Sequence, residues 1–254
     1  MLAMLMSMSA LSIKALQAVK NIVFPHTCPL CAKPMGEKEG CCAECLQSIA
    51  AISQYTCLSC GIPLNPTLAP GPCGACLKKP LPQQQTHHLY LYQGVVRDAI
   101  LAWKLQGQDV ALNFLLQAAT PHLKQLISKD DLLLPVPMPL YRMRLSGLHH
   151  SADLCQKISN IVGCQIDTTI LRRTGNHTRQ SALQGKARSV NLRKAFMLRD
   201  TSSDKLSSFK DKGKIWVIDD ILTTGATLRH ACQVMQKTKH PIFAFSFART
   251  WHDS

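Results

Sequence analysis

The stretch that decides the fold runs Ile215-Trp216-Val217-Ile218-Asp219-Asp220-Ile221-Leu222-Thr223-Thr224-Gly225-Ala226-Thr227. Its first four residues form a continuous apolar run, as in a buried parallel strand. Two adjacent carboxylates follow, and then a short turn that is rich in hydroxyl groups and opens a predicted helix. In open α/β sheets, ligands bind beyond the carboxyl ends of the strands. The stretch therefore predicts a binding loop at the edge of a parallel sheet.

The chemistry of this loop matches a sugar phosphate. Adjacent carboxylates suit the vicinal hydroxyls of a ribose, while the backbone N–H groups of the turn and the helix N-terminus suit a 5-phosphate. Taken singly, the acids can be helix caps and the Thr-Gly a plain turn. The whole constellation indicates phosphoribosyl binding and resembles the signature of type I phosphoribosyltransferases. The binding residues would be Asp219, Asp220, Thr223, Thr224, Gly225, Ala226 and Thr227.

The rest of the C-terminal region alternates strand and helix patterns. Such alternation predicts an α/β fold of type I phosphoribosyltransferase-like architecture, a parallel sheet flanked by helices, over residues 86–254. We expect the helix over residues 110–127 to bend or break at Pro121. The expected strands are residues 88–92, 132–134, 166–171, 214–218 and 242–247, and the expected helices are residues 95–104, 110–127, 151–161 and 226–235.

Nine of the twelve cysteines lie between Cys28 and Cys76, where they include four C-x-x-C pairs. Two thiolates three positions apart on a tight turn can face one tetrahedral ion, so two such pairs complete a closed structural zinc site. Four pairs in succession favour zinc over redox or disulfide use. The two sets of metal ligands would be Cys28, Cys31, Cys42 and Cys45, and Cys57, Cys60, Cys73 and Cys76.

Two details of this double zinc ribbon, residues 24–80, stay open in the sequence. Cys41 precedes Cys42 and could replace it as a ligand, and the pairs could interleave instead of combining in chain order. A proline-broken polar linker follows and places the domain boundary near residue 82. Each site has all four positions filled by thiolates, so the two zinc ions would be structural.

Residues 1–23 begin with an uncharged, largely apolar stretch that ends at Ile13. No basic residue precedes this stretch and no clear small-residue cleavage site follows it, which argues against a signal peptide. It is also too short to span a bilayer. We therefore expect an N-terminal helix packed on the zinc module, in a cytoplasmic protein without a membrane span.

The net charge of +14 is concentrated in one part of the chain, because residues 141–200 hold 11 Lys or Arg against 3 Asp. A field of this size attracts polyanions such as nucleic acid, or substrates with several phosphates. The alternative is a basic but functionally neutral surface. The predicted basic face comprises Arg172, Arg173, Arg179, Gln180, Arg188, Asn191 and Arg193.

The order of modules resembles the ComF family of competence-related proteins (ComFC/GntX type). The family's lysine–glycine stretch after the first core helix corresponds to Trp103-Lys104-Leu105-Gln106-Gly107. Its strand end corresponds to Pro135-Val136-Pro137, and its basic segment, R-x-T…Q-x-x-L…R-x-x-N…A-F, to residues 172–196. The resemblance implies binding of Mg²⁺-phosphoribosyl pyrophosphate (PRPP) or a nucleotide-like ligand, and a role in DNA uptake.

One segment departs from the family pattern. Where the family usually shows Arg-Gly-Phe-Asn-Gln, in the region that resembles a pyrophosphate loop, this chain has Ser146-Gly147-Leu148-His149-His150. Two arginines just upstream could replace the lost charge, and the histidines could donate hydrogen bonds or be plain surface side chains. The expected phosphate contacts are Lys104, Arg142, Arg144 and Gly147.

Three functions fit these features. A phosphoribosyltransferase would pass ribose phosphate from PRPP to a nitrogen acceptor, with Asp219 and Asp220 as catalytic residues. A non-catalytic accessory would bind single-stranded DNA through the basic face and the zinc ribbon. A scaffold would dock a DNA-uptake helicase on its zinc module. The sequence names no acceptor, because it shows no element for recognising a particular base.

Overall fold

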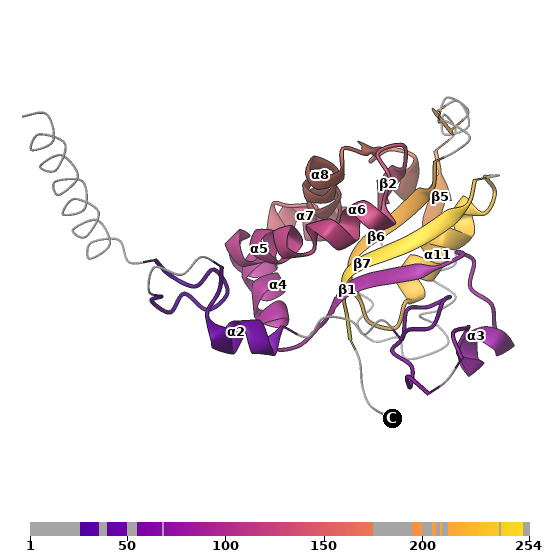
Figure 1. Ribbon diagram of the computed structural model, residues 1–254. Coiled ribbons are helices and arrows are strands. Elements are labelled where there is room, and N and C mark those ends of the chain that lie inside the picture. The colour runs from indigo at the N-terminus through magenta and orange to yellow at the C-terminus, as the bar shows by residue number, and fades with distance from the viewer. Residues whose placement is uncertain are drawn as a thin grey trace, which may run out of the picture. The chain divides into compact units, whose positions relative to one another are not determined.

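The computed structural model describes residues 26–35, 40–49, 55–67, 69–174, 195–199, 205–206, 209, 213–238 and 240–250. The chain divides into two compact units, residues 1–49 and residues 50–254 (Figure 1). The first zinc ribbon belongs to the first unit, and the second ribbon shares a unit with the sheet. The domain limits expected from the sequence stay predictions, and the expected N-terminal helix of residues 1–23 lies outside the described residues.

The two ribbons use the same local design. In the first, Thr27 and Pro34 form an antiparallel bridge around a tight turn, and helix α2 (Ala43–Ser48) follows. In the second, the bridge joins Thr56 and Pro63, and helix α3 (Gly74–Lys78) follows. In each ribbon the turn carries one cysteine pair, and the start of the helix carries the other.

A five-stranded parallel sheet forms the centre of the second unit, in the strand order β1-β7-β6-β2-β3. The two long central strands pair along most of their length, with Val217 opposite Ala244 and Asp219 opposite Ser246. This confirms the predicted α/β fold class. The strands are β1 (Thr86–Leu91), β2 (Leu132–Pro135), β3 (Gln165–Ile166), β6 (Ile215–Leu222) and β7 (Ile242–Arg249).

Helices cover the sheet, and alternate side chains of the strands point to different faces. Val217 and Ala244 pack with Leu228 and Cys232 of α11 in one apolar core. Figure 1 shows α4, α5, α6 and α8 on the other side of the strands, where the Tyr90 hydroxyl donates to the Leu115 carbonyl at 2.7 Å. The helices are α4 (Gly94–Gln106), α5 (Val110–Ala118), α6 (Thr120–Leu126), α7 (Leu140–Ser146), α8 (His150–Val162) and α11 (Ala226–Met235).

Three element limits differ from those expected. The break in the helix of residues 110–127 precedes Pro121, which lies in the first turn of α6, where its missing N–H costs nothing. Strand β6 continues to Leu222, so Asp219 and Asp220 lie within the strand and not after it. The strand expected over 166–171 is two strands, because β4 (Leu171–Arg173) pairs antiparallel with β5 (Phe196–Leu198) at the base of the basic segment.

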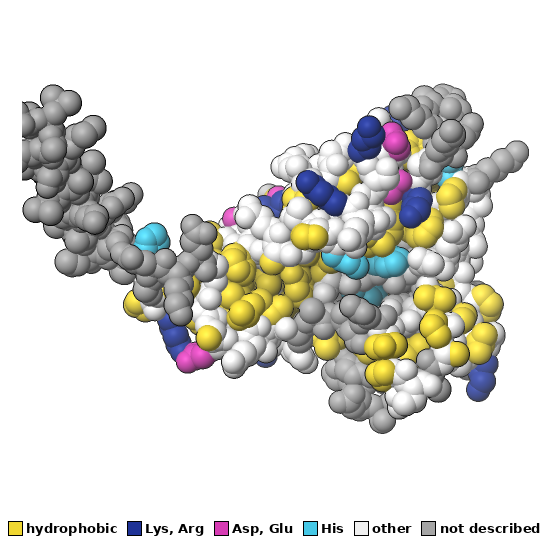
Figure 2. Space-filling view, viewed as in Figure 1, with side chains coloured by type: hydrophobic (Ala, Val, Ile, Leu, Met, Phe, Trp, Pro, Cys, Tyr) yellow, Lys and Arg dark blue, Asp and Glu magenta, His cyan; other side chains and the backbone are white. Residues whose placement is uncertain are grey.

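On the face shown in Figure 2, apolar side chains gather over α4 and α5. The exposed large side chains of these helices include Leu101, Leu105 and Val110. In the part of the chain that the structure describes, no helix combines the length and the apolar character that crossing a membrane requires.

Candidate functional site

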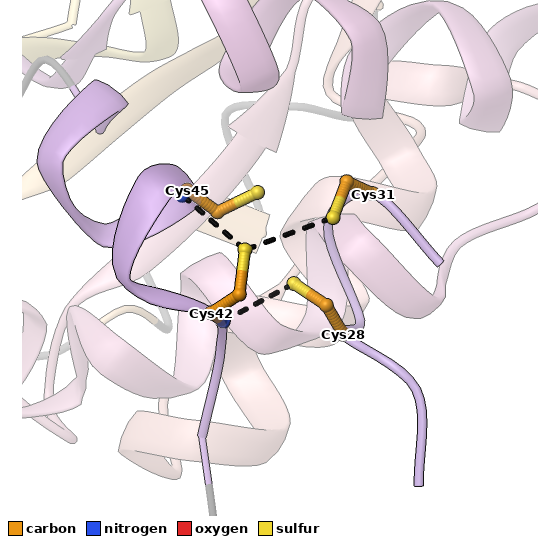
Figure 3. A group of neighbouring side chains, drawn as sticks. All are labelled: Cys28, Cys31, Cys42 and Cys45. Carbon is orange, nitrogen blue, oxygen red and sulfur yellow. Dashed lines mark hydrogen bonds between the residues drawn. The ribbon is translucent and has the colours of Figure 1, made fainter. Parts of the chain in front are cut away.

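The first metal site gathers four thiol groups from the turn and from the start of α2 (Figure 3). Their sulfur atoms lie within 4.8 Å of one another, and Cys31 Sγ is 3.8 Å from Cys42 Sγ. A zinc ion with bonds of about 2.3 Å to each sulfur places the corners of its tetrahedron about 3.8 Å apart. The donor set therefore fits zinc, and it excludes Cys41. The ligands are Cys28, Cys31, Cys42 and Cys45.

The second metal site repeats this arrangement. Its sulfur atoms also lie within 4.8 Å of one another, with 3.8 Å between Cys60 Sγ and Cys73 Sγ. Both sites use consecutive pairs and not interleaved ones, and none of the twelve cysteines forms a disulfide. Two four-cysteine sites that fit structural zinc are thus confirmed. The ligands are Cys57, Cys60, Cys73 and Cys76.

Backbone N–H groups donate hydrogen bonds to the cysteine sulfur atoms and favour the thiolate form. The amides of Cys60 and Cys73 donate to Cys57 Sγ at 3.4 and 3.1 Å. Burial raises the pKa of Cys57, but these backbone hydrogen bonds outweigh it and bring the pKa down to about 7. Because the thiolate is the form that binds metal, this local geometry favours zinc near neutral pH.

The predicted phosphoribosyl loop joins β6 to α11. Gly225 has φ 71°, in the left-handed region, and caps the N-terminus of α11. The first backbone N–H groups of a helix have no acceptor within the helix, and such groups can bind an anion. Here the Ala226 N–H is 3.4 Å from the Thr224 hydroxyl oxygen. A small hollow is present here, lined by Asp219 and by residues 221–228.

The acid pair contacts two other elements. Lys104 Nζ at the end of α4 lies 2.6 Å from Asp220 Oδ2. The Ser151 hydroxyl in the first turn of α8 donates to Asp219 Oδ1 at 3.2 Å. Burial raises the pKa of Asp219 to about 7, and the neighbouring charge of Asp220 adds to this effect. The structure therefore brings Lys104 to the site, as expected, and adds Ser151, for which the sequence carried no signal.

The two histidines of the altered loop are not plain surface side chains. His149 Nδ1 accepts from the Ala152 N–H and Nε2 lies 3.2 Å from the Met138 N, so the ring ties α8 to the end of β2. Burial lowers the pKa of His149. His150 is 5% exposed and packs edge-on against Trp103 at 5.0 Å between ring centroids. Both histidines therefore support the site and do not project into solvent.

The other predicted phosphate contacts lie on and just after α7. Arg142 and Arg144 are exposed on this short helix, and Gly147 ends it with φ 68°. Of the predicted basic face, Arg172 is exposed and Arg173 is half-buried, with its guanidinium 5.4 Å from the Phe196 ring. The remaining members of that face lie outside the described residues: Arg179, Gln180, Arg188, Asn191 and Arg193.

Comparison with known proteins supports the order of modules. A family model described as a double zinc ribbon domain matches residues 19–77. Over 220 residues the chain is 28% identical to the DNA utilization protein YhgH of Escherichia coli O157:H7. This alignment covers 84% of this chain and 92% of the relative. Over 205 residues it is 26% identical to competence protein F of Haemophilus influenzae, which covers 79% and 86%. The chain is thus a homologue of these DNA utilization and competence proteins over most of its length.

The double zinc ribbon match includes both ribbons, and the similarity to the relatives covers most of the chain. The DNA utilization protein YhgH of Salmonella typhimurium strain LT2 is 26% identical to this chain over 221 residues. The resemblance that the motifs indicated is thereby confirmed. This similarity assigns no role to an individual residue of the loop.

Proposed function

We propose that the site binds the ribose 5-phosphate part of PRPP or of a related ligand. The 5-phosphate takes the backbone N–H groups of Thr223–Thr227, and the ribose hydroxyls take Asp219 and Asp220. One observation carries the proposal: the acid pair lies near the end of β6, and the left-handed Gly225 leads directly from it into α11. Carboxylates for the sugar and N–H groups for the phosphate are thus only a few residues apart.

Lys104 is the proposed contact for a second phosphate group. It is paired with Asp220 at 2.6 Å, so a ligand that engages the carboxylate leaves the ammonium group beside the ligand's own negative charge. Arg142, Arg144 and Gly147 are further proposed pyrophosphate contacts, because α7 directly precedes the first turn of α8, whose Ser151 reaches Asp219. A partly buried cation next to an acid pair, with exposed arginines on the neighbouring helix, suits a polyphosphate.

The acid pair also fits a magnesium ion that arrives with pyrophosphate. Mg²⁺ prefers carboxylate oxygens and usually binds through one or two carboxylates together with substrate phosphates. Asp219 or Asp220 would supply those oxygens, and the ion would neutralise charge on the pyrophosphate. Burial raises the pKa of Asp219 to about 7, and a bound cation would favour the charged form of this carboxyl group.

The biological setting that we propose is DNA utilisation. Relatives that align with most of the chain carry the names DNA utilization protein and competence protein F. The repeating unit of a DNA backbone is a deoxyribose phosphate, which shares the phosphate with this ligand but lacks the 2′-hydroxyl, so the phosphate-binding half of the loop also suits a nucleotide ligand. The cytoplasm is the compartment that we propose for this role.

Calorimetry with Mg²⁺-PRPP tests the binding site. We expect the Asp219→Asn/Asp220→Asn double variant to bind at least about tenfold more weakly than the wild type, because hydrogen bonds to charged groups are lost. Asp98→Asn is the matched control, since Asp98 is an exposed acid whose partner is Arg97. Equal affinity of the double variant and the control, or no binding to the wild type, would overturn the proposal.

Turnover is the stronger version of the proposal. The bond from C1 of the ribose to pyrophosphate would break, with the electron pair leaving on pyrophosphate, and a bond from C1 to a nitrogen of the acceptor would form. The acid pair would stabilise the positive charge that develops on the sugar. Pyrophosphate release measured with a panel of nucleobases and nucleotides separates turnover from binding.

A second candidate is binding without turnover, and the His149 ring favours it. A ring nitrogen of His149 accepts a hydrogen bond from a backbone N–H, of Ala152 or of Met138 according to the tautomer, so this side chain of the segment that resembles a pyrophosphate loop is engaged by the chain's own backbone. In this version the basic face contacts single-stranded DNA. The affinity for a single strand should fall with salt, and neutralising Arg188 and Arg193 should reduce the slope of log K against log salt by roughly 1.4. A slope that stays at the wild-type value contradicts this candidate.

A further inference from the structure

A cavity of about 350 Å³ lies between the second zinc ribbon and the start of α11. Its floor is the edge of the sheet, with Thr86 and Arg249. Gln83 lines it from the segment before β1, and Arg229 from α11. The volume falls within the range of small-molecule sites in proteins, about 300–1,000 Å³. The phosphoribosyl loop borders the cavity but does not account for it.

The ribbon side of the cavity is held firmly against the sheet. Gly61 of the ribbon approaches β1 so closely that an added Cβ would lie 2.5 Å from the Thr86 carbonyl oxygen. The Thr86 hydroxyl donates to the Ser59 carbonyl at 2.8 Å, and Arg249 Nη1 donates to the Cys60 carbonyl at 2.7 Å. These contacts fix two walls relative to each other, so the cavity is a built feature of this unit.

Gln83 lines the cavity and holds an unused acceptor. This side chain is 6% exposed, and its Nε2 donates to the Thr86 hydroxyl at 2.9 Å. Because that hydroxyl gives its own proton to Ser59, it can only accept from Gln83, and this fixes the orientation of the amide. Gln83 Oε1 is then buried without a partner among the described residues. Leaving a buried acceptor unpaired is costly, so a ligand N–H is the expected partner.

Arg229 lines the cavity and forms no ion pair with the described residues. It lies one turn beyond Gly225, and its buried Nε has no partner in the described part of the chain. Arg249, the other arginine of the cavity, already has the Cys60 carbonyl and the thiolate cluster as neighbours. No Asp or Glu is present among the lining residues. We therefore expect an anionic group of the ligand beside Arg229.

The remaining wall is apolar, and it continues into the loop. Ile62, Leu81 and Leu228 offer aliphatic surfaces on which a flat ring can pack. Leu222, Thr224, Gly225 and Leu228 line both this cavity and the small hollow at the loop. A ligand in the cavity is thus a direct neighbour of a phosphate bound at the loop.

We propose that this cavity is a second subsite, which holds a nucleoside monophosphate unit beside the phosphate bound at the loop. The base packs on the aliphatic wall and donates an N–H to Gln83 Oε1, and the phosphate pairs with Arg229. The adjacency to a bound phosphate rests on the function proposed above, whereas the cavity and its unpaired groups do not. The unit comes either from a free nucleotide or from the neighbouring position of a strand.

Calorimetry on the zinc-loaded full chain tests the subsite. The loop is first saturated with ribose 5-phosphate. Thymidine 5′-monophosphate and deoxyadenosine 5′-monophosphate should then still bind. Arg229→Gln should weaken this second event about tenfold or more, and Arg229→Lys should restore part of it. Arg97→Gln is the matched control, because Arg97 is exposed on α4 and remote from the lining residues. No second event, or equal affinity in the Arg229→Gln and Arg97→Gln variants, overturns the subsite.

A 5′-phosphorylated dithymidine dinucleotide distinguishes the two sources. If the unit belongs to a strand, the dinucleotide binds at least about tenfold more tightly than the mononucleotide, and the loop and Arg229 variants both weaken it. If it binds no more tightly, the occupant is a free nucleotide and the subsite stands in that form. If ribose 5-phosphate does not bind to the wild type, the proposed function fails, and titration of the mononucleotide alone still compares Arg229→Gln with Arg97→Gln.

Discussion

Lys104 Nζ lies 2.6 Å from Asp220 Oδ2, and this ion pair joins the last turn of α4 to the strand that carries the acid pair. The two residues are more than one hundred positions apart in the chain. Their side chains are only 23% and 13% exposed, so the pair is shielded from much of the solvent. The electrostatics of the candidate site therefore depend on a contact that the parallel topology creates.

Replacing Lys104 should shift the pH dependence of ligand binding. The Lys104 ammonium favours the charged form of Asp219, whose pKa is about 7, so Lys104→Gln should raise that pKa further. Affinity for Mg²⁺-PRPP should fall as the pH drops through about 7 in the wild type, and at a higher pH in the variant. Calorimetry between pH 6 and pH 9 measures both midpoints, and coincident midpoints would contradict the assignment.

Replacing Asp219 should stabilise the fold at neutral and alkaline pH. Burial raises the pKa of Asp219 from 3.8 to about 7, so the folded state holds its proton more tightly than the unfolded state does. Stability of the wild type is therefore lost as the pH rises from about 4 to 7. Asp219→Asn removes this penalty, on the order of 1–3 kcal/mol at pH 8. Urea denaturation at pH 4 and pH 8 checks it, and the gain should vanish at the lower pH.

Removing one zinc ligand should have different consequences in the two ribbons. Cys28→Ser and Cys57→Ser should each lower the zinc content from two ions per chain to one. The second ribbon contacts the sheet within its own unit, through Thr86 of β1 and Arg249 of β7, so Cys57→Ser should also lower the melting temperature of the sheet.

Cys41→Ser is the control for the zinc prediction. Cys41 lies outside both groups of four sulfur atoms, so this variant should keep two zinc ions. Metal analysis after gel filtration gives the counts, and differential scanning calorimetry gives the melting temperature. Loss of one ion from the Cys41→Ser variant would show that the ligand set is wrong.

Gly61 should be intolerant of alanine. Its φ of 67° strains any other residue, and an added Cβ would also lie 2.5 Å from the Thr86 carbonyl and 2.7 Å from the His88 ring. Gly163→Ala is the matched control, because Gly163 has φ 85° with nothing within 4 Å of the added atom. Both variants should lose about 1 kcal/mol to backbone strain, and Gly61→Ala should lose roughly 1–3 kcal/mol more. Equal losses in denaturant unfolding would show that the ribbon does not press on β1.

The turn between β6 and α11 and the zinc ligands were predictable because their sequence patterns are local. An apolar run, an acid pair and a glycine turn occupy consecutive positions, and each cysteine pair needs only one tight turn. The limits of β6 were less predictable, since pairing with β7 extends the strand through Asp219 and Asp220. The contact between His149 and the Met138 backbone had no local signal, because Met138 comes from a different segment.

The sequence by itself determined the α/β class, the two four-cysteine sites and the position of the loop, because periodicity and spacing carry that information along the chain. Only the tertiary structure brought Lys104 to Asp220, Ser151 to Asp219 and the second ribbon to β1. It also created the cavity with Gln83 and Arg229, whose residues come from segments far apart in the sequence. Such contacts depend on how parallel strands and their crossovers pack, which no single segment encodes.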